Sequence, residues 1–211
     1  MMKRRLILFA AAAVMLLASS PAPAQDAGEL VRDGVSCLAA GDFNAARERF
    51  DRAVAADPDY PYAYAYRSMT GIKLGMYGDA VDDALKVLEL SDRMGAKDAD
   101  PLRLMALSNL GTAFIRMEKY EAAATVLNEL IALDDDDPIP YFLLGEAYRG
   151  VGGEEELESA LDAYSRAIRL DPAYAAAYFY RGVVKTTLGD EEGGLLDRET
   201  AIGLDGSYMD K

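Results

Sequence analysis

The chain has 211 residues, of which 22 are Lys or Arg and 36 are Asp or Glu, so its formal net charge is −14. It contains no His, no Trp and a single Cys. Without His, Ser-His-Asp and Cys-His catalytic groups and imidazole metal sites are excluded, and one thiol cannot close an intrachain disulfide. The negative charge argues against nucleic-acid binding, which depends on Lys and Arg. Hydrophobic residues make up 51% of the chain, so we expect a folded protein.

The first 24 residues have the order of a secretory signal peptide. Basic residues at 3–5 precede an apolar run at 6–18, and Ala-Pro-Ala at 22–24 supplies the small residues of a cleavage site. The apolar run is shorter than the roughly 20 residues that a membrane-spanning helix needs, although an uncleaved membrane anchor is the alternative. We therefore predict a signal peptide over 1–24, cleaved after Ala24. The mature chain, 25–211, is expected in an exported aqueous compartment, the periplasm of a bacterial cell, without stable membrane insertion.

A pattern with a period of 34 residues runs through the rest of the chain. The phrase Asp-Pro-Asp-Tyr at 57–60 returns as Asp-Pro-Ala-Tyr at 171–174. Each phrase follows small and large apolar residues at intervals of three and four, which lie on one face of a helix. In the first copy these are Ala46, Phe50 and Ala53, and in the second they are Ala160, Tyr164 and Ala167. The Pro of each phrase ends its helix, because it cannot donate the required hydrogen bond.

This arrangement resembles the tetratricopeptide repeat, with an aromatic residue at position 4, Gly at 8, Ala at 20 and 27, an aromatic residue at 24 and Pro at 32. Five copies can be placed, at 27–60, 61–94, 104–137, 138–174 and 175–208. The resemblance implies an all-α fold, a right-handed α-solenoid of about five stacked helix-turn-helix repeats. Gly at position 8 and Ala at position 20 would let the two helices of a repeat approach closely.

Some residues depart from this pattern. Cys37 occupies an aromatic position of the first repeat, and we interpret it as a small core residue. The alternative is a free thiol that forms an intermolecular disulfide. In the last repeat Arg198 replaces an aromatic residue, which predicts a polar terminal face. The adjacent Gly193 and Gly194 predict that the final helix is the least stable.

Nine residues, 95–103, separate the second and third repeats. Gly95 predicts the end of the preceding helix, and Asp100-Pro101 predicts the N-cap and first residue of the next one. We therefore expect a short linker at 96–99 and a helix that begins at Pro101.

The acidic residues predict no metal or catalytic site. Clusters at 134–137 and 154–156 lack the spacing of a calcium-binding loop, and Asp137 is expected to cap the helix that begins at Pro138. Pairs such as Asp82-Asp83 are expected at exposed helix positions. We predict neither cofactor nor enzyme activity; a hydrolase or metal protein is the alternative, which sensitivity to a chelator would reveal.

The concave surface of the predicted solenoid is the candidate binding site. In the family that the chain resembles, positions 2, 5, 6, 9, 12 and 13 of each first helix line this surface. Carried over, they imply a groove rich in aromatic and Met side chains, as interface cores are. The candidate residues are Tyr62, Tyr66, Met69, Lys73, Met105, Asn109, Thr112, Arg116, Phe142, Glu146, Arg149 and Phe179. Tyr66 has a second interpretation, namely packing against a neighbouring helix.

These observations predict a non-catalytic adaptor of the cell envelope that binds a protein or peptide segment in its groove. The Lys and Asn pattern by which chaperone-binding members of the family hold a terminal carboxylate is absent, so the partner has no predicted identity. Self-association of the solenoid and binding of a small solute are the alternatives.

Overall fold

The computed structural model describes residues 26–209, and the predicted signal peptide lies outside them. All regular structure in this part of the chain is helical. The α-helices, numbered from α2, are α2 (Ala27–Ala39), α3 (Phe43–Ala56), α4 (Pro61–Lys73), α5 (Tyr77–Ser91), α6 (Ala96–Arg116), α7 (Tyr120–Leu133), α8 (Pro138–Val151), α9 (Glu154–Leu170), α10 (Ala175–Thr187) and α11 (Glu191–Leu204). A short 3-10 helix, η1 (Gly206–Tyr208), follows α11.

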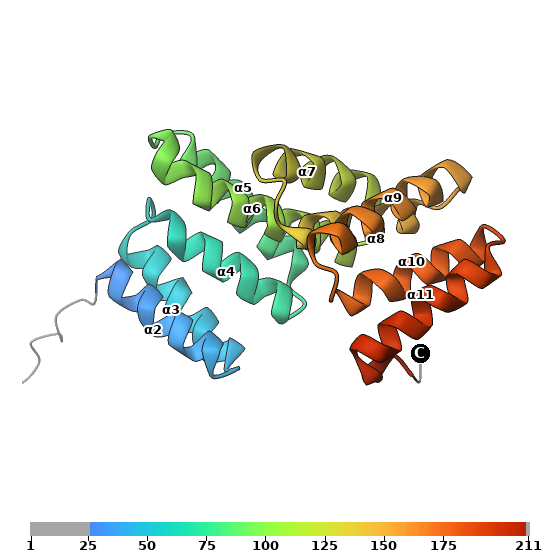
Figure 1. The fold of residues 1–211 in the computed structure, drawn as a ribbon. Helices are drawn as coiled ribbons and strands as arrows, with labels where there is room; N and C mark the ends of the chain where they lie inside the picture. The colour runs from blue at the N-terminus through green and yellow to red at the C-terminus, as the bar shows by residue number, and fades with distance from the viewer. Residues whose placement is uncertain (1–25, 210–211) are drawn as a thin grey trace, which may run out of the picture.

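The ten α-helices of residues 26–209 form five consecutive pairs that stack into an arch (Figure 1). Each helix packs against the next along the chain, and α4 also packs against both α2 and α6. Because α6 packs against α8 as well, the first helices of the first four pairs lie side by side. The first and last pairs both lie low in Figure 1, on opposite sides, so the array bends around an inner surface. The prediction of an all-α solenoid of helix-turn-helix repeats is confirmed.

Small residues at positions 8 and 20 bring the two helices of a pair together, as expected. A Cβ atom on Gly145 would lie only 2.5 Å from the ring of Tyr164, and Ala160 is fully buried. In the second pair Ser68 replaces the Gly, and its hydroxyl donates a 2.7 Å hydrogen bond to the carbonyl of Ala80. The close approach of the helices is therefore kept, because the buried hydroxyl has a partner.

The final pair packs closely through two glycines. A Cβ atom on Gly182 would lie 2.7 Å from the carbonyl oxygen of Gly194, and one on Gly194 would lie 2.2 Å from Oγ1 of Thr186. Gly194 stands where the other repeats have Ala, so the structure gives a packing reason for it. The low stability of α11 that Gly193 and Gly194 suggest stays a prediction.

The predicted linker at 96–99 is wrong, because α6 begins at Ala96 and holds Pro101 in its second turn. Gly95 is the N-cap of α6, with φ −69°, rather than the end of α5. Ala99 is buried, so the added turn places an apolar side chain in the core, ahead of the buried Leu102. This burial offsets the single helical hydrogen bond that Pro101 cannot make.

The structure supports the prediction for Cys37 and corrects the one for the terminal face. Cys37 is half-buried and packs against the core of the first pair, which supports its interpretation as a core residue. The alternative, an intermolecular disulfide, stays a prediction. Arg198 lies over the ring of Phe179 at 5.6 Å. However, Leu195 and Leu196 of α11 are 60% and 64% exposed, so the predicted polar terminal face is wrong for this side of the helix.

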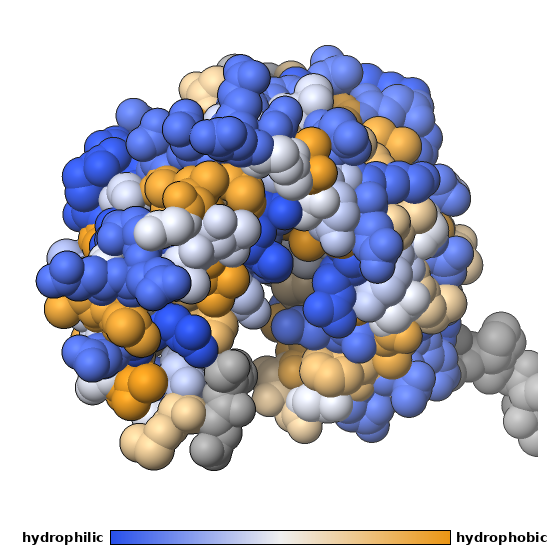
Figure 2. Space-filling model, turned by 90° about the vertical axis from the view of Figure 1, so that its right-hand side faces the viewer, coloured by the Kyte–Doolittle hydropathy of each residue, from blue (hydrophilic) through white to orange (hydrophobic). Residues whose placement is uncertain are grey.

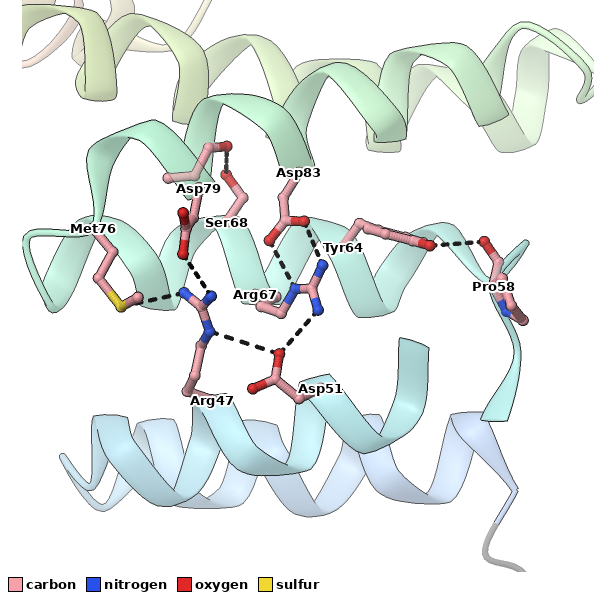
Figure 3. Close-up of polar contacts among 10 residues, drawn as sticks. Arg47, Asp51, Pro58, Tyr64, Arg67, Ser68, Met76, Asp79 and Asp83 are labelled. Atoms are coloured by element: carbon pink, nitrogen blue, oxygen red, sulfur yellow. Dashed lines mark hydrogen bonds and ion pairs between the residues drawn. The ribbon is translucent and has the colours of Figure 1, made fainter. Parts of the chain in front are cut away.

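A buried ion pair joins the helices of the second pair (Figure 3). Nε and Nη2 of Arg67 donate to the two carboxylate oxygens of Asp83 at 2.8 and 2.7 Å, and Nη1 donates to Asp51 of α3 at 2.9 Å. Asp83 is only 6% exposed. The predicted exposure holds for Asp82 and is wrong for Asp83, because the guanidinium supplies the partner that a buried carboxylate needs.

The same arrangement recurs in the last pair at the same spacing. Nε and Nη2 of Arg181 donate to Asp197 at 2.7 Å each, and Nη1 donates to Ser165 of the preceding pair at 3.1 Å. Asp197 has a second cation, because Nζ of Lys185 lies 2.9 Å from its carboxylate. Burial opposes the charged form of Asp197, but the hydrogen bonds from Arg181 and Lys185 outweigh it and lower its pKa. Burial raises the pKa of Asp83, which the hydrogen bonds of Arg67 offset only in part.

We expect the stability of the α10–α11 pair to fall when the pH drops below about 3.8, the ordinary pKa of an Asp carboxyl. Because the pKa of Asp197 is lower in the folded protein, its contribution is complete above the ordinary value and is lost as the pH falls through the folded pKa. The measurement is urea unfolding of α10 and α11, followed by NMR of their amides, for the native protein and Asp197→Asn. The difference in unfolding free energy between the native protein and Asp197→Asn should become smaller below that pH. A difference that does not change with pH would contradict the lowered pKa of Asp197.

Candidate functional site

The inner surface carries an open pocket at its N-terminal end, between α2 and α4. The pocket has a volume of about 490 Å³. It is lined by Gly28, Val31, Arg32, Val35, Ser36, Tyr60, Tyr62 and Tyr66, and we call it the tyrosine pocket. Two of the residues predicted for the groove, Tyr62 and Tyr66, are thus brought together here with a third tyrosine.

The three tyrosines are held by local packing. Tyr60 is the N-cap residue of α4, and its ring lies 5.7 Å from that of Tyr62, tilted by 50°. Tyr66 stacks on Phe50 of α3 at 5.8 Å, so it both packs within the fold and lines the pocket. Burial, together with the nearby Tyr62 and Asp26, raises the pKa of Tyr60, so its hydroxyl stays protonated at neutral pH.

The lining of the pocket differs from the rest of this acidic protein. Val31 and Val35 add apolar surface to the tyrosine rings, and Arg32 supplies an exposed guanidinium. No carboxylate is among the lining residues. The pocket therefore offers apolar and aromatic contact, phenolic hydroxyls and one positive charge, with the carboxylate of Asp26 close by.

The centre of the predicted groove, on α4 and α6, is more enclosed. Asn109 is 9% exposed, and its Nδ2 donates to the carbonyl of Ala65 at 3.1 Å, which ties α6 to α4. Met69 and Met105 are half-buried, and Met105 packs against the core. Lys73 is exposed. Of these predicted groove residues, Lys73 is thus the most accessible to a partner.

Two further predicted residues on α6 are engaged within the protein. The hydroxyl of Thr112 donates to the carbonyl of Ser108 at 2.9 Å. Nε of Arg116 donates to the hydroxyl of Tyr77 at 3.2 Å, and its guanidinium lies over that ring at 5.9 Å. Arg116 is nevertheless exposed, so its charge remains accessible to solvent.

At the C-terminal end, the inner surface is filled by its own aromatic side chains. The ring of Phe142 on α8 lies 5.9 Å from Tyr164, 5.1 Å from Tyr174 and 5.9 Å from Tyr180. Phe179 on α10 is 7% exposed, with the ring of Tyr208 5.0 Å away. The structure therefore places Phe142 and Phe179 in packing roles.

Glu146 and Arg149 form a polar network beside this cluster. Arg149 donates to both carboxylate oxygens of Glu146, at 3.2 and 3.0 Å, and lies over the ring of Tyr180 at 5.1 Å. The hydroxyl of Tyr164 also donates to Glu146. Burial, with the charge of Glu146, raises the pKa of Tyr164 strongly, so this hydroxyl remains a donor. The charges of Glu146 and Arg149 thus mainly satisfy each other.

Among residues 26–209, no group of three or more Cys, Asp or Glu side chains is placed to hold a metal ion. The acidic cluster at 154–156 lies in the first turn of α9, where carboxylates stabilise the positive end of the helix. Asp137 accepts a 2.9 Å hydrogen bond from the backbone N–H of Ile139, so the predicted cap of α8 is confirmed.

Sequence models of one repeat family match most of the chain. The model described as "Tetratricopeptide repeat" matches residues 34–101, and the model described as "TPR repeat" matches residues 111–152 and 154–189. The chain belongs to the tetratricopeptide repeat family.

Several known proteins are similar to parts of this chain in sequence or in structure. The Protein SGT1 homolog of Oryza sativa subsp. japonica is 38% identical over 86 residues, which are 41% of this chain and 21% of that protein. The chain spans about a third or less of two further curated relatives. The structure of MamA (41-end) from Desulfovibrio magneticus RS-1 has a TM-score of 0.72 at 25% identity, covering 87% of this chain and 98% of MamA. YrrB has a TM-score of 0.64 at 23% identity, covering 87% and 89%, and shows the fold alone.

The tetratricopeptide repeat positions explain which pocket residues the sequence prediction missed. Positions 2, 5, 6 and 9 of the first repeat are occupied by Gly28, Val31, Arg32 and Val35. The rule that identified Tyr62 and Tyr66 in the second repeat would have found them. Tyr60 lies in the turn before α4, outside the first-helix positions, so that rule does not reach it.

Within residues 26–209 of this tetratricopeptide repeat chain, no helix combines the length and apolar character needed to cross a bilayer.

Proposed function

We propose that this tetratricopeptide repeat protein is a non-catalytic adaptor that binds a segment of a partner protein in its concave groove, anchored in the tyrosine pocket. The observation that carries this proposal is the contrast along the inner surface. The N-terminal end holds an open pocket of about 490 Å³, whereas Phe142 and its neighbours fill the C-terminal end.

The chemistry of the pocket favours a particular kind of segment. Tyrosine rings offer large contact areas at low cost in side-chain entropy, and their hydroxyls bind peptide groups. Arg32 at the edge of the pocket favours an acidic group on the ligand, since the guanidinium pairs well with carboxylates. We therefore propose an extended segment with an apolar or aromatic anchor and a neighbouring carboxylate.

A related structure supports peptide binding as a use of this fold. YrrB is described as "a TPR protein with an unusual peptide-binding site". The similarity to YrrB covers 87% of this chain, and the proposed pocket lies on the inner surface of the same kind of array.

We also propose that the adaptor acts outside the cytoplasm, because residues 1–24 have the order of a signal peptide. Intact-mass analysis of the protein from its own host is the test. The expected mass is that of a chain starting at Gln25, recovered with the envelope fraction. A chain retaining 1–24 in the cytoplasm would overturn the location.

Replacing Tyr62 by Ala is expected to weaken segment binding about 30-fold, the size of a loss near 2 kcal/mol for an aromatic anchor. The experiment first selects ligands for the native protein from a displayed library of random 12-residue peptides. Affinities of the selected peptides are then measured by fluorescence anisotropy for the native protein and for Tyr62→Ala and Arg32→Gln. Arg32→Gln should weaken mainly those peptides that carry a carboxylate.

Tyr141→Ala is the matched control, because Tyr141 is also half-buried on a first helix but lies outside the tyrosine pocket, on α8. It should leave the affinities within about two-fold, a loss below 0.5 kcal/mol. Circular dichroism checks that each variant folds. Selected peptides that bind Tyr62→Ala as tightly as the native protein would refute the pocket as the binding site.

A further inference from the structure

The outer face of α11 carries exposed apolar side chains at the end of the array. Leu195 and Leu196 are 60% and 64% exposed. Together with Glu191, Glu192 and Glu199 they line a surface depression of about 470 Å³. Figure 2 faces the α9–α11 end of the molecule and shows apolar patches interrupting a largely hydrophilic surface. We call these five residues the α11 face.

The α11 face differs in sequence from the same surface of the other repeats. It has Glu at a position where they have an apolar or aromatic residue, and Leu at a position where they have a polar one. Position 17 is apolar or aromatic in the first four repeats and is Glu191 in the last. Position 22 is polar in the first four repeats and is Leu196 in the last. The residues of the first four repeats are Phe43, Tyr77, Tyr120 and Leu157 at position 17, and Glu48, Asp82, Thr125 and Asp162 at position 22.

The chain covers other apolar groups at this end but not the two leucines. Tyr208 of η1 and Arg198 both lie against the ring of Phe179, at 5.0 and 5.6 Å. Phe179 is consequently 7% exposed. Within the described residues, the C-terminal segment thus closes over α10 and leaves Leu195 and Leu196 open to solvent.

The geometry of the stack indicates what would cover the α11 face. In the second, third and fourth repeats, the residue at the position of Leu195 packs into a core completed by the first helix of the following repeat; the first repeat has Arg47 there. Val81 packs in a core with residues of α6, Ala124 with residues of α8, and Leu161 with Val184 of α10. A helix is therefore the element that fits beside Leu195.

The charges around the two leucines indicate what kind of helix would bind there. Glu191, Glu192 and Glu199 are all exposed around the leucines. A helix with Lys or Arg beside its apolar side chains would complement them. A second copy of this chain is disfavoured, because its formal charge is −14.

We propose that the α11 face is a docking surface for a cationic amphipathic helix of a partner protein. It is separate from the tyrosine pocket and uses the edge of the solenoid rather than its groove. An apolar stripe of the incoming helix covers Leu195 and Leu196, and its flanking basic residues pair with the glutamates.

The test uses a synthetic, fluorescein-labelled 18-residue amphipathic helix with Leu on one face and Lys on the other. Its anisotropy is followed on titration with the purified protein. Leu195→Ser combined with Leu196→Ser is expected to weaken binding at least ten-fold. Glu191→Gln combined with Glu192→Gln should weaken it and reduce its dependence on salt.

Leu85→Ser combined with Leu133→Ser is the matched control, since these leucines of α5 and α7 are 50% and 48% exposed. This control should bind the peptide as the native protein does. Equal losses in both double-Ser variants, or equal binding of a peptide with Glu in place of Lys, would overturn the proposal. Sedimentation provides a further arm: a native dimer that disappears in Leu195→Ser/Leu196→Ser would show that a second copy covers the face. Loss of peptide binding in Tyr62→Ala would instead assign the peptide to the tyrosine pocket.

Discussion

Asp83→Asn is expected to destabilise the second helix pair by about 3 kcal/mol, the low end of the range for breaking a buried ion pair. The amide cannot accept both hydrogen bonds that Arg67 donates, so the guanidinium, whose side chain is 18% exposed, loses its main counter-charge. Asp51 remains as a second partner of Arg67, which is why we expect the low end. Amide hydrogen exchange in α4 and α5 is the appropriate measurement, because repeat arrays open locally.

Asp82→Asn is the matched control for this experiment. Asp82 is adjacent in sequence and exposed, so its replacement should change the free energy of opening by less than about 0.5 kcal/mol. Equal effects of the two variants would contradict the burial of Asp83.

A double replacement tests the reason for the loss. Arg67→Met with Asp83→Leu removes both charges together and should recover most of the stability, because an apolar pair avoids the desolvation of two ions. The raised pKa of Asp83, which burial causes, agrees with a costly desolvation at this site. A double variant as unstable as Asp83→Asn would show that the loss comes from packing rather than from an unpaired charge.

Gly145→Ala is expected to cost the fourth helix pair about 2 to 3 kcal/mol through overpacking. The new Cβ would lie 2.5, 2.7 and 2.8 Å from three ring atoms of Tyr164. That ring is fully buried, and its hydroxyl is held by Glu146, so it cannot withdraw. Urea unfolding followed by circular dichroism, with hydrogen exchange in α8 and α9, measures the loss.

Gly78→Ala is the corresponding control. Gly78 lies in the first turn of α5, and apart from its chain neighbours and the backbone of its own helix no atom would lie within 4 Å of its Cβ. Ala should therefore stabilise the helix, by about 0.5 to 1 kcal/mol, since it restricts the unfolded chain and favours the helix. A loss of stability in Gly78→Ala similar to that in Gly145→Ala would contradict the steric explanation.

The helix pairing was predictable because its causes are local and repeated. Gly145 and Ala160 occupy fixed positions within their repeat, and the structure packs them where the two helices meet. The start of α6 was not predictable in the same way. Asp100-Pro101 has the local preference of a helix start, but the helix begins at Ala96, and the added turn buries Ala99.

The candidate site was predictable only in part. The positional rule selected Tyr62 and Tyr66, and both line the tyrosine pocket. It could not show that Asn109 donates to a backbone carbonyl of α4 or that Tyr208 packs on Phe179. The first contact joins two repeats, and the second joins the first helix of the last repeat to the 3-10 helix after α11, so the positions that the repeats share specify neither.

The sequence by itself determined that this chain is a helical solenoid, because a 34-residue period of small, aromatic and Pro residues specifies each helix pair locally. Only the tertiary structure decided which side chains remain accessible. Helix packing buries Asp83 against Arg67 of the same pair and fills the groove around Phe142, while the pocket between α2 and α4 and the leucines of α11 stay open. Exposure depends on how the helices pack, both within a repeat and against the next one, and the repeat period alone does not specify that packing.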